Sequence, residues 1–395
     1  MNKTCVPDLL SAALFGQRGK PDVDDWSSVY TELKDQTVLA IPADLIAQYD
    51  MPEELRREWK KQILQQMIYY HATEHIQTEL LEAIRTAGIP VVILKGTSAA
   101  VYYPKPEYRA MGDIDFLVKP EHFDRACCVM EEAGCKETTS KEEEERGRHR
   151  VYRKAGVEIE LHRSFATIGT DEQKACFDNY LFEDIVPERF TLSTVQNGLV
   201  LIEHIAQHMF AGIGFRQIID WMMYVYHCLS DQMWNESFLP MAQSVGLDKL
   251  AVTATRMCQL YLGLPKEKYN WCSTANDSVC EKLMDYVMTS GNFGCKRDEI
   301  STHSIPQLPS IRKPVYFFRY LQEHGKQNWK ALGKHTWLKP FAWLYQLCRN
   351  IRFLAKNRVD SRKLKMIYKE GAQRRVLFDK VGIRSYEEDS GNDHG

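Results

Sequence analysis

The chain has 395 residues and a formal net charge of -2, with 26% charged and 44% hydrophobic residues. This length allows two or three domains, and the composition excludes a polycation, a collagen-like chain and a fully disordered chain. The 11 cysteines are odd in number and lack zinc-binding spacing, so we expect free thiols rather than a disulfide framework. No apolar run reaches the ~18 residues of a membrane-spanning helix, and we expect a cytoplasmic protein.

The first part of the chain, residues 1–87, is predicted to be helical. Apolar side chains recur at helical spacing from Pro52 to Thr86, and Gly88 ends this long amphipathic pattern. We expect this N-terminal region to pack on the domain that follows.

Residues 88–168 alternate between strand and helix patterns and predict a small mixed α+β domain. The expected strands cover 90–95, 113–118, 135–139, 148–154 and 157–162, and the expected helices cover 97–103 and 120–133. Ala155-Gly156 joins the last two strands as a hairpin.

After this domain the strand patterns stop, and residues 169–295 predict a mainly helical domain. Its helices are expected at 194–211, 216–229, 237–246, 248–262 and 275–291. A Ser- and Pro-containing linker at 296–311 follows, then a basic aromatic helical region at 312–384 and a disordered polar tail at 385–395. Helices in the basic region are expected near 314–323, 340–356 and 361–378.

The basic region predicts an anionic partner. Residues 311–384 contain 19 Lys and Arg but only 4 Asp and Glu, interleaved with aromatic side chains. Such a segment can stack bases and bind phosphates, or lie at an anionic membrane surface. The third interpretation is a packed helical domain whose exposed face is basic. A peripheral location at the membrane is therefore the alternative to a purely cytoplasmic one.

Asp113 and Asp115 stand one residue apart in an apolar strand pattern. Because side chains alternate along a strand, the two carboxylates share one face and repel unless a cation lies between them. Magnesium prefers carboxylate oxygens, and Glu160 in a later strand is the expected third ligand. Glu158 shares the face of Glu160 and is the alternative. We expect two Mg²⁺ ions here, or Mn²⁺ instead, at a site for in-line phosphoryl displacement.

Gly96, Thr97 and Ser98 lie between a strand and a helix, where backbone N–H groups and hydroxyls can hold a phosphate. The same tripeptide also suits an ordinary turn and helix N-cap. Lys95 and Arg109 are the nearest cations. Each is expected either to neutralise phosphate charge or to form an ion pair that positions the loop.

Several further residues have two open interpretations. His162 either orients a metal-binding carboxylate by a hydrogen bond or has no role in the site. His204 and His208 share a helix face but lack a third zinc ligand nearby, so packing is the alternative to metal binding. Arg216 either reaches the nucleotide phosphates or pairs with Asp220 four residues later.

Three stretches together resemble a known family. They are LKGTSAAVYY from Leu94, RAMGDIDFLV from Arg109 and VEIELHRSF from Val157. This combination resembles the DNA polymerase beta-like nucleotidyltransferase superfamily and, more narrowly, a bacterial family of uncharacterised nucleotidyltransferases. The resemblance covers roughly residues 60–230 and implies a mixed sheet with flanking helices, followed by a helical partner domain. Thr97 departs from the Gly or Ser that is usual in the superfamily.

The resemblance also implies an activity and site roles. A nucleoside monophosphate would move from an NTP to a hydroxyl or phosphate acceptor, with release of pyrophosphate. Gly96, Thr97 and Ser98 would hold the triphosphate, while Asp113 and Asp115 bind metal. Glu160 would complete the site, and it is preferred over Glu158 because Leu-His follows it, as in the narrower family.

The acceptor stays open among a small molecule, a glycan precursor, tRNA and protein. Two alternatives accompany the main prediction. One is a toxin-like nucleotidyltransferase that modifies tRNA or protein. The other is a non-catalytic scaffold that retains the fold.

Overall fold

The computed structural model describes residues 5–16, 23–140, 147–296, 314–333, 335–356 and 361–383. The chain divides into two compact units, Met1–Lys296 and Arg297–Gly395. The predicted segments 1–87, 88–168 and 169–295 therefore all lie within the first unit. The expected linker, apart from Lys296, and the expected disordered tail fall outside the described residues.

A five-stranded mixed sheet forms the centre of the α+β part. Its strands are β1 (Val91–Leu94), β2 (Ile114–Val118), β3 (Lys136–Glu137), β4 (His149–Lys154) and β5 (Val157–His162). The order is β1-β2-β5-β4-β3, with β2 and β5 parallel and the other neighbours antiparallel. The predicted mixed sheet is thus confirmed. The β4–β5 hairpin turns at Ala155 (φ 48°) and Gly156 (φ 85°), and two left-handed residues suit a tight turn that follows the strand twist.

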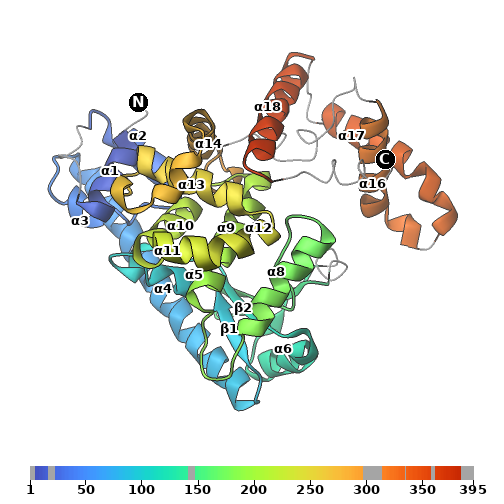
Figure 1. Ribbon diagram of the computed structural model, residues 1–395, viewed down its shortest axis with the longest axis horizontal. Helices are drawn as coiled ribbons and strands as arrows, with labels where there is room; N and C mark the ends of the chain where they lie inside the picture. The colour runs from blue at the N-terminus through green and yellow to red at the C-terminus, as the bar shows by residue number, and fades with distance from the viewer. Residues whose placement is uncertain are drawn as a thin grey trace. The chain divides into compact units, whose positions relative to one another are not determined.

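The apolar face of the sheet is covered by two helices, α4 (Glu53–Thr86) and α6 (Phe123–Glu132). Ile114, Phe116 and Val118 of β2 pack into this core, and each fully buried side chain of this size contributes about 1.5–3 kcal/mol. Because side chains alternate along β2, this packing turns Asp113 and Asp115 to the opposite face. Figure 1 shows α4 and α6 beside the sheet, with the helical part toward its other side.

The N-terminal region contacts both parts of the first unit. Helices α1 (Cys5–Phe15), α2 (Trp26–Asp35) and α3 (Ala43–Ile46) precede α4. Gln36 accepts a hydrogen bond from the backbone N–H of Phe215 at 2.9 Å and donates one to the carbonyl of Val287 at 3.1 Å. The region therefore packs on the sheet through α4 and binds the helical part near α2.

The helical part follows the sheet. Its helices are α8 (Asp171–Asp184), α9 (Thr194–Ala211), α10 (Phe215–Cys228), α11 (Asp231–Met233), the π-helix η3 (Trp234–Phe238), α12 (Leu239–Ser244), α13 (Asp248–Tyr261) and α14 (Asp277–Ser290). Short helical turns complete the unit at α5 (Gly96–Ala100), η1 (Pro106–Tyr108), η2 (Pro120–His122), η4 (Lys266–Lys268), η5 (Asn270–Thr274) and η6 (Asn292–Gly294). The prediction found α9 to the residue but not α8.

Helix α8 escaped prediction because little of it is apolar and buried. Its buried side chains are Phe177, Leu181 and the charged Asp178, which accepts hydrogen bonds from Ser164 and from backbone N–H groups. A local signal was present, since Thr170 and Gln173 form a capping box at its start.

The second unit contains α16 (Pro314–Asn328), η8 (Lys330–Gly333), η9 (Thr336–Phe341), α17 (Ala342–Lys356) and α18 (Ser361–Lys380). Many of its aromatic rings pack on one another. Tyr320 and Leu321 centre a cluster that includes Trp343, and Trp329 stacks on Tyr345 at 5.1 Å between ring centroids. These rings therefore form internal packing of this unit. Among the described residues, no helix is both long and apolar enough to span a membrane.

Candidate functional site

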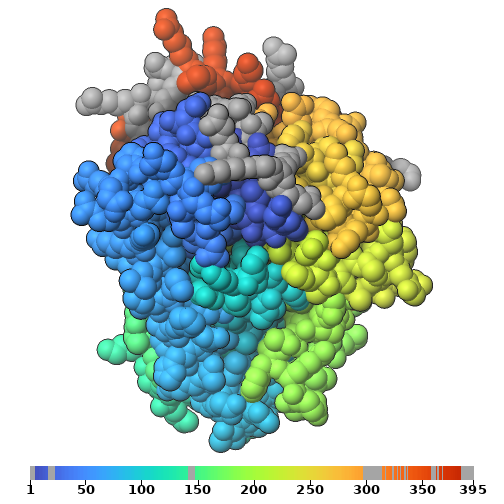
Figure 2. All heavy atoms as spheres, turned by 90° about the vertical axis from the view of Figure 1, so that its left-hand side faces the viewer, coloured from blue at the N-terminus to red at the C-terminus, as the bar shows by residue number. Residues whose placement is uncertain are grey.

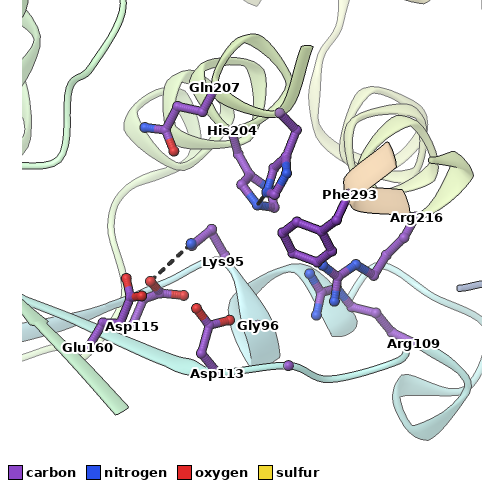
Figure 3. Close-up of a pocket in the computed structure, with 12 residues that line it drawn as sticks. Lys95, Gly96, Arg109, Asp113, Asp115, Glu160, His204, Gln207, Arg216 and Phe293 are labelled. Carbon is purple, nitrogen blue, oxygen red and sulfur yellow. Dashed lines mark hydrogen bonds and ion pairs between the residues drawn. The ribbon is translucent and has the colours of Figure 1, made fainter. Parts of the chain in front are cut away.

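A pocket of about 210 Å³ lies where the carboxylate face of the sheet meets α9 and α10 (Figure 3). It brings together seven of the nine predicted site residues with side chains from the helical part. Its lining consists of Lys95, Gly96, Arg109, Gly112, Asp113, Asp115, Glu160, His204, Gln207, His208, Arg216 and Phe293. We call the strand side the sheet wall, made of Lys95, Asp113, Asp115 and Glu160. We call the opposite side the helix wall, made of His204, Gln207, His208, Arg216 and Phe293.

The sheet wall places three carboxylates together. Strands β2 and β5 are parallel and in a register that sets Asp115 beside Glu160, while Asp113 precedes Asp115 on the same face. One ligand oxygen from each of the three lies within 4.8 Å of the others. Asp115 is 1% exposed, whereas Asp113 and Glu160 are half-buried. Such a set of hard oxygen donors fits Mg²⁺ or Mn²⁺.

Asp115 is held by two cationic groups. The Lys95 ammonium lies 2.9 Å from Oδ1, and Nε2 of His162 lies 3.0 Å from the same oxygen. Burial acts to lower the pKa of Lys95, but Asp115, Asp113 and Glu160 outweigh it and raise that pKa. The ammonium is therefore a fixed positive charge within the carboxylate cluster.

His162 connects Asp115 to Glu160. Its Nε2 lies 3.1 Å from Oε2 of Glu160 as well as 3.0 Å from Asp115. Burial disfavours the charged imidazole, but hydrogen bonds to Asp115 and Glu160 outweigh it and raise the pKa of His162 to about 9. Burial likewise acts to raise the pKa of Glu160, but the hydrogen bond and charge of His162 lower it overall. The geometry supports the interpretation that His162 orients two carboxylates.

The turn before α5 aims Lys95 at the site. Lys95 has φ 48° and ψ -144°, a conformation that costs a non-glycine residue about 1 kcal/mol or more and that recurs at functional sites. Gly96 follows with φ 48°, and a Cβ there would lie 3.3 Å from Cε of Met111. The glycine thus provides both the left-handed backbone and the close approach that this turn requires.

Thr97 and Ser98 face away from the pocket. The Thr97 hydroxyl donates to Oε1 of Gln77 at 2.8 Å, and the Ser98 hydroxyl donates to the carbonyl of Lys95 at 2.7 Å. Neither residue lines the pocket. Of the predicted phosphate-binding tripeptide, the structure brings only Gly96 to the site.

Glu158, the alternative third carboxylate, lies elsewhere. It forms an exposed ion pair with Arg153 at 3.1 Å and does not line the pocket. The geometry therefore favours Glu160. A second group of potential metal ligands, His149, Glu160 and His162, adjoins the three carboxylates and shares Glu160 with them.

Arg109 forms a buried ion pair with Asp220. Its Nε lies 2.8 Å from Oδ1 and its Nη2 2.7 Å from Oδ2, and the Tyr103 hydroxyl donates to the same carboxylate at 2.7 Å. Asp220 and the guanidinium are 1% and 3% exposed. The alternative in which Arg216 pairs with Asp220 is therefore wrong: the partners of Asp220 are Arg109 and Tyr103, and no ion pair joins Arg216 to Asp220 among the described residues.

Arg216 faces the pocket without a carboxylate partner among the described residues. Its Nη1 lies 3.4 Å from the carbonyl of Ala110, and its buried Nε has no hydrogen-bond partner there. Burial, together with the nearby charge of Arg109, lowers the pKa of Arg216. A buried cation of this kind is suited to a polyanionic ligand.

His204 and His208 form a neutral pair on α9. Their Nε2 atoms are 2.8 Å apart, so one imidazole donates to the other. Burial lowers the pKa of His208 to about 3 and that of His204 well below its ordinary value. Within the described residues neither belongs to a group of three potential metal ligands, so the geometry favours packing over zinc binding.

Two side chains of the helix wall were not predicted from the sequence. Gln207 lies three residues after His204, and this helical spacing could have placed it on the same face. Phe293 had no such signal, because it reaches the pocket from a turn after α14 that only the tertiary packing brings to α9.

The comparisons with known proteins agree with this geometry. A family model described as uncharacterised nucleotidyltransferase matches residues 22–263, which is more than half of the chain. No curated protein and no solved structure matches the chain. The matched range includes every pocket residue except Phe293. The chain belongs to this family of uncharacterised nucleotidyltransferases.

Proposed function

We propose that the chain transfers a nucleoside monophosphate from an NTP to a hydroxyl or phosphate acceptor, with release of pyrophosphate, and that the reaction depends on Mg²⁺. One observation carries the proposal: three carboxylates with ligand oxygens within 4.8 Å share a pocket with Lys95, Arg109 and Arg216. Phosphoryl transfer is suited to this combination, because metal-held and cationic groups stabilise charge on both the attacking acceptor oxygen and the leaving oxygen.

The carboxylates fit a divalent cation chemically. The Asp113 carboxylate makes no hydrogen bond or ion pair within the part of the chain that the structure describes, and it lines the pocket, so its oxygens are open to a ligand. Asp113, Asp115 and Glu160 would hold the metal, which supplies charge neutralisation and acidifies an attacking hydroxyl when it is bound. His162 and Lys95 fix the orientation of Asp115 before any ligand arrives, and this pre-organisation reduces the reorganisation that the reaction requires.

The two arginines of the pocket would have different roles toward the substrate. Arg216 has open donors and would bind the triphosphate or the departing pyrophosphate. Arg109 is committed to Asp220, so it would act mainly by placing the Gly112–Asp113 segment and by its charge. Glu160, which stays ionised because His162 lowers its pKa, would complete the metal site and promote proton removal from the acceptor.

The test combines labelling with a matched pair of variants. Each α-labelled NTP is incubated with the protein, Mg²⁺ and a cell extract, and the labelled fraction is separated into small molecules, RNA and protein. We expect label transfer by the wild type and by Glu158→Gln, and a loss of about 100-fold or more in Glu160→Gln.

Activity in Glu160→Gln with a loss in Glu158→Gln would reverse the assignment of the third carboxylate. Label in tRNA or protein alone would select the toxin-like alternative. A wild-type chain that binds no Mg²⁺–NTP by calorimetry would contradict the proposal and favour the scaffold.

A further inference from the structure

Phe293 is the aromatic side chain of an otherwise polar pocket. Phe293 is 58% exposed, although the rest of the pocket lining is dominated by charged and imidazole side chains. Figure 3 shows the ring between His204 and the guanidinium groups of Arg109 and Arg216, on the side facing Lys95 and Asp113. The exposed part of this apolar side chain adds no burial energy to the fold, and it lines the pocket, where a ligand could cover it.

The backbone that presents this ring is strained. Phe293 has φ 53° and ψ 23°, inside the short turn η6. Gly291 and Gly294 on either side have φ 65° and 70°, which glycine adopts freely. Phe293 does so at a cost on the order of 1 kcal/mol or more, and such strain is retained where the surrounding structure enforces it.

The turn is anchored directly to α9 and α10. Asn292 accepts a hydrogen bond from Gln217 at 2.8 Å. A Cβ added to Gly212, at the end of α9, would lie 2.4 Å from Cα of Gly294, so the two backbones touch. The ring is therefore held by packed backbone rather than by a loose loop.

Two contacts fix the ring inside the pocket. The Arg216 guanidinium carbon lies 5.9 Å from the ring centroid, and the His208 ring meets it edge-on at 4.7 Å. A cation near an aromatic ring is attracted to its π face.

We propose that Phe293 is the stacking platform for the nucleobase of the NTP, an inference that rests on the proposed function. An NTP presents a triphosphate, a ribose and a base, and only the base has a π face. The carboxylates, Lys95 and Arg216 match the triphosphate and its metal, whereas Phe293 matches the base. Because every base has a π face, Phe293 contributes affinity without choosing among bases.

The test compares nucleotide binding with binding of inorganic triphosphate, which has no base. Calorimetry with Mg²⁺ and each of the four α,β-methylene NTPs, which cannot transfer the nucleotide, is carried out on the full chain. We expect Phe293→Ala to weaken binding of all four by about 10-fold or more, and Phe293→Trp to restore it. Binding of inorganic triphosphate is expected to stay within about two-fold of the wild type.

Phe293→Leu is the matched control, because it keeps apolar bulk and the same left-handed backbone cost but lacks the π face. It is expected to bind nucleotides as weakly as Phe293→Ala. Equal loss for nucleotide and inorganic triphosphate, unchanged nucleotide binding, or tighter binding in Phe293→Ala would each overturn the inference. A wild type that binds neither probe would instead overturn the proposed function, and this inference with it.

Discussion

The two walls of the pocket differ in whether their buried polar and charged side chains have partners within the fold. On the sheet wall, Asp115 is paired with Lys95 and His162, and His162 also reaches Glu160. On the helix wall, Arg216 has no carboxylate partner among the described residues, and His204 keeps a buried Nδ1 without a hydrogen bond. Figure 2 shows one face of the first unit, on which the N-terminal helices lie beside the helical part that carries this wall.

This difference indicates how the pocket is built for a ligand. A paired cluster is already in its working geometry, and it needs only a metal to complete its charge. An unpaired buried cation carries an unfavourable desolvation energy that a polyanion would relieve. The sheet wall is thus pre-organised, while the helix wall gains its counter-charge from the substrate.

The largest expected effect separates the two aspartates of the sheet wall. Asp113→Asn and Asp115→Asn should each lower nucleotidyl transfer by roughly 1,000-fold, since each removes a metal ligand. Only Asp115→Asn should also destabilise the fold, by about 3 kcal/mol, because it leaves the buried Lys95 without its ion-pair partner and His162 with Glu160 alone. Asp113 has no such partners, so its variant should stay within about 1 kcal/mol of the wild type.

Urea unfolding in the presence of EDTA measures the stability difference without metal, and label transfer measures activity. Equal destabilisation by both substitutions would show that Asp113 is also a structural charge, and the contrast between paired and open carboxylates would be lost. Retained transfer in Asp113→Asn would contradict its assignment as a ligand.

The next effect tests the two arginines. Arg109→Met should destabilise the fold by about 3–5 kcal/mol, because it leaves Asp220 buried and uncompensated. Arg216→Met should leave the free energy of unfolding unchanged or raise it, since it removes an unpaired buried charge. The same substitution should weaken binding of inorganic triphosphate by roughly 10–100-fold, the value of a hydrogen bond to a charged group.

Unfolding curves and calorimetry on the two variants check this contrast. Destabilisation by Arg216→Met comparable to that by Arg109→Met would mean that Arg216 is satisfied within the fold. Unchanged triphosphate binding would remove Arg216 from the substrate site.

The sheet wall was accessible from the sequence because its chemistry follows from local periodicity. The spacing of Asp113 and Asp115 fixes their common face, and the alternation in β5 does the same for Glu160. Choosing Glu160 over Glu158 needed the register of β2 and β5, which pairs Asp115 with Glu160. Periodicity could not supply that register, and the preference for Glu160 came instead from the Leu-His that follows it, as in the family that the sequence resembles.

Several contacts around the pocket join distant parts of the chain and have no local signature in the sequence. Arg109 and Asp220 are 111 residues apart, and the nearer candidate for Asp220 was Arg216 on the same helix. Thr97 and Ser98 had the residue types of a phosphate loop, yet Gln77 and the Lys95 carbonyl take their hydroxyls. Asp220 therefore pairs with a distant arginine rather than with the nearby one. The hydroxyls of Thr97 and Ser98 bind other parts of the protein rather than the phosphate that their spacing suggested.

The smallest expected effect concerns two glutamates whose pKa values are shifted in opposite directions on folding. His162 lowers the pKa of Glu160, whereas burial raises the pKa of Glu203 on α9 to about 7, despite hydrogen bonds from the N–H groups of Thr167 and Ile168. A carboxyl whose pKa is raised on folding stabilises the fold below its ordinary pKa of 4.5, and this contribution is lost as pH rises through about 7.

Glu203→Gln keeps the oxygen that accepts those N–H groups but cannot ionise. The wild type should therefore lose stability relative to this variant between about pH 4.5 and pH 7, by an amount on the order of 3 kcal/mol. Urea unfolding of both proteins across this pH range measures the difference. Parallel pH profiles would show that the N–H groups of Thr167 and Ile168 offset the burial of Glu203, and that the helical part, like the sheet wall, compensates its buried carboxylate.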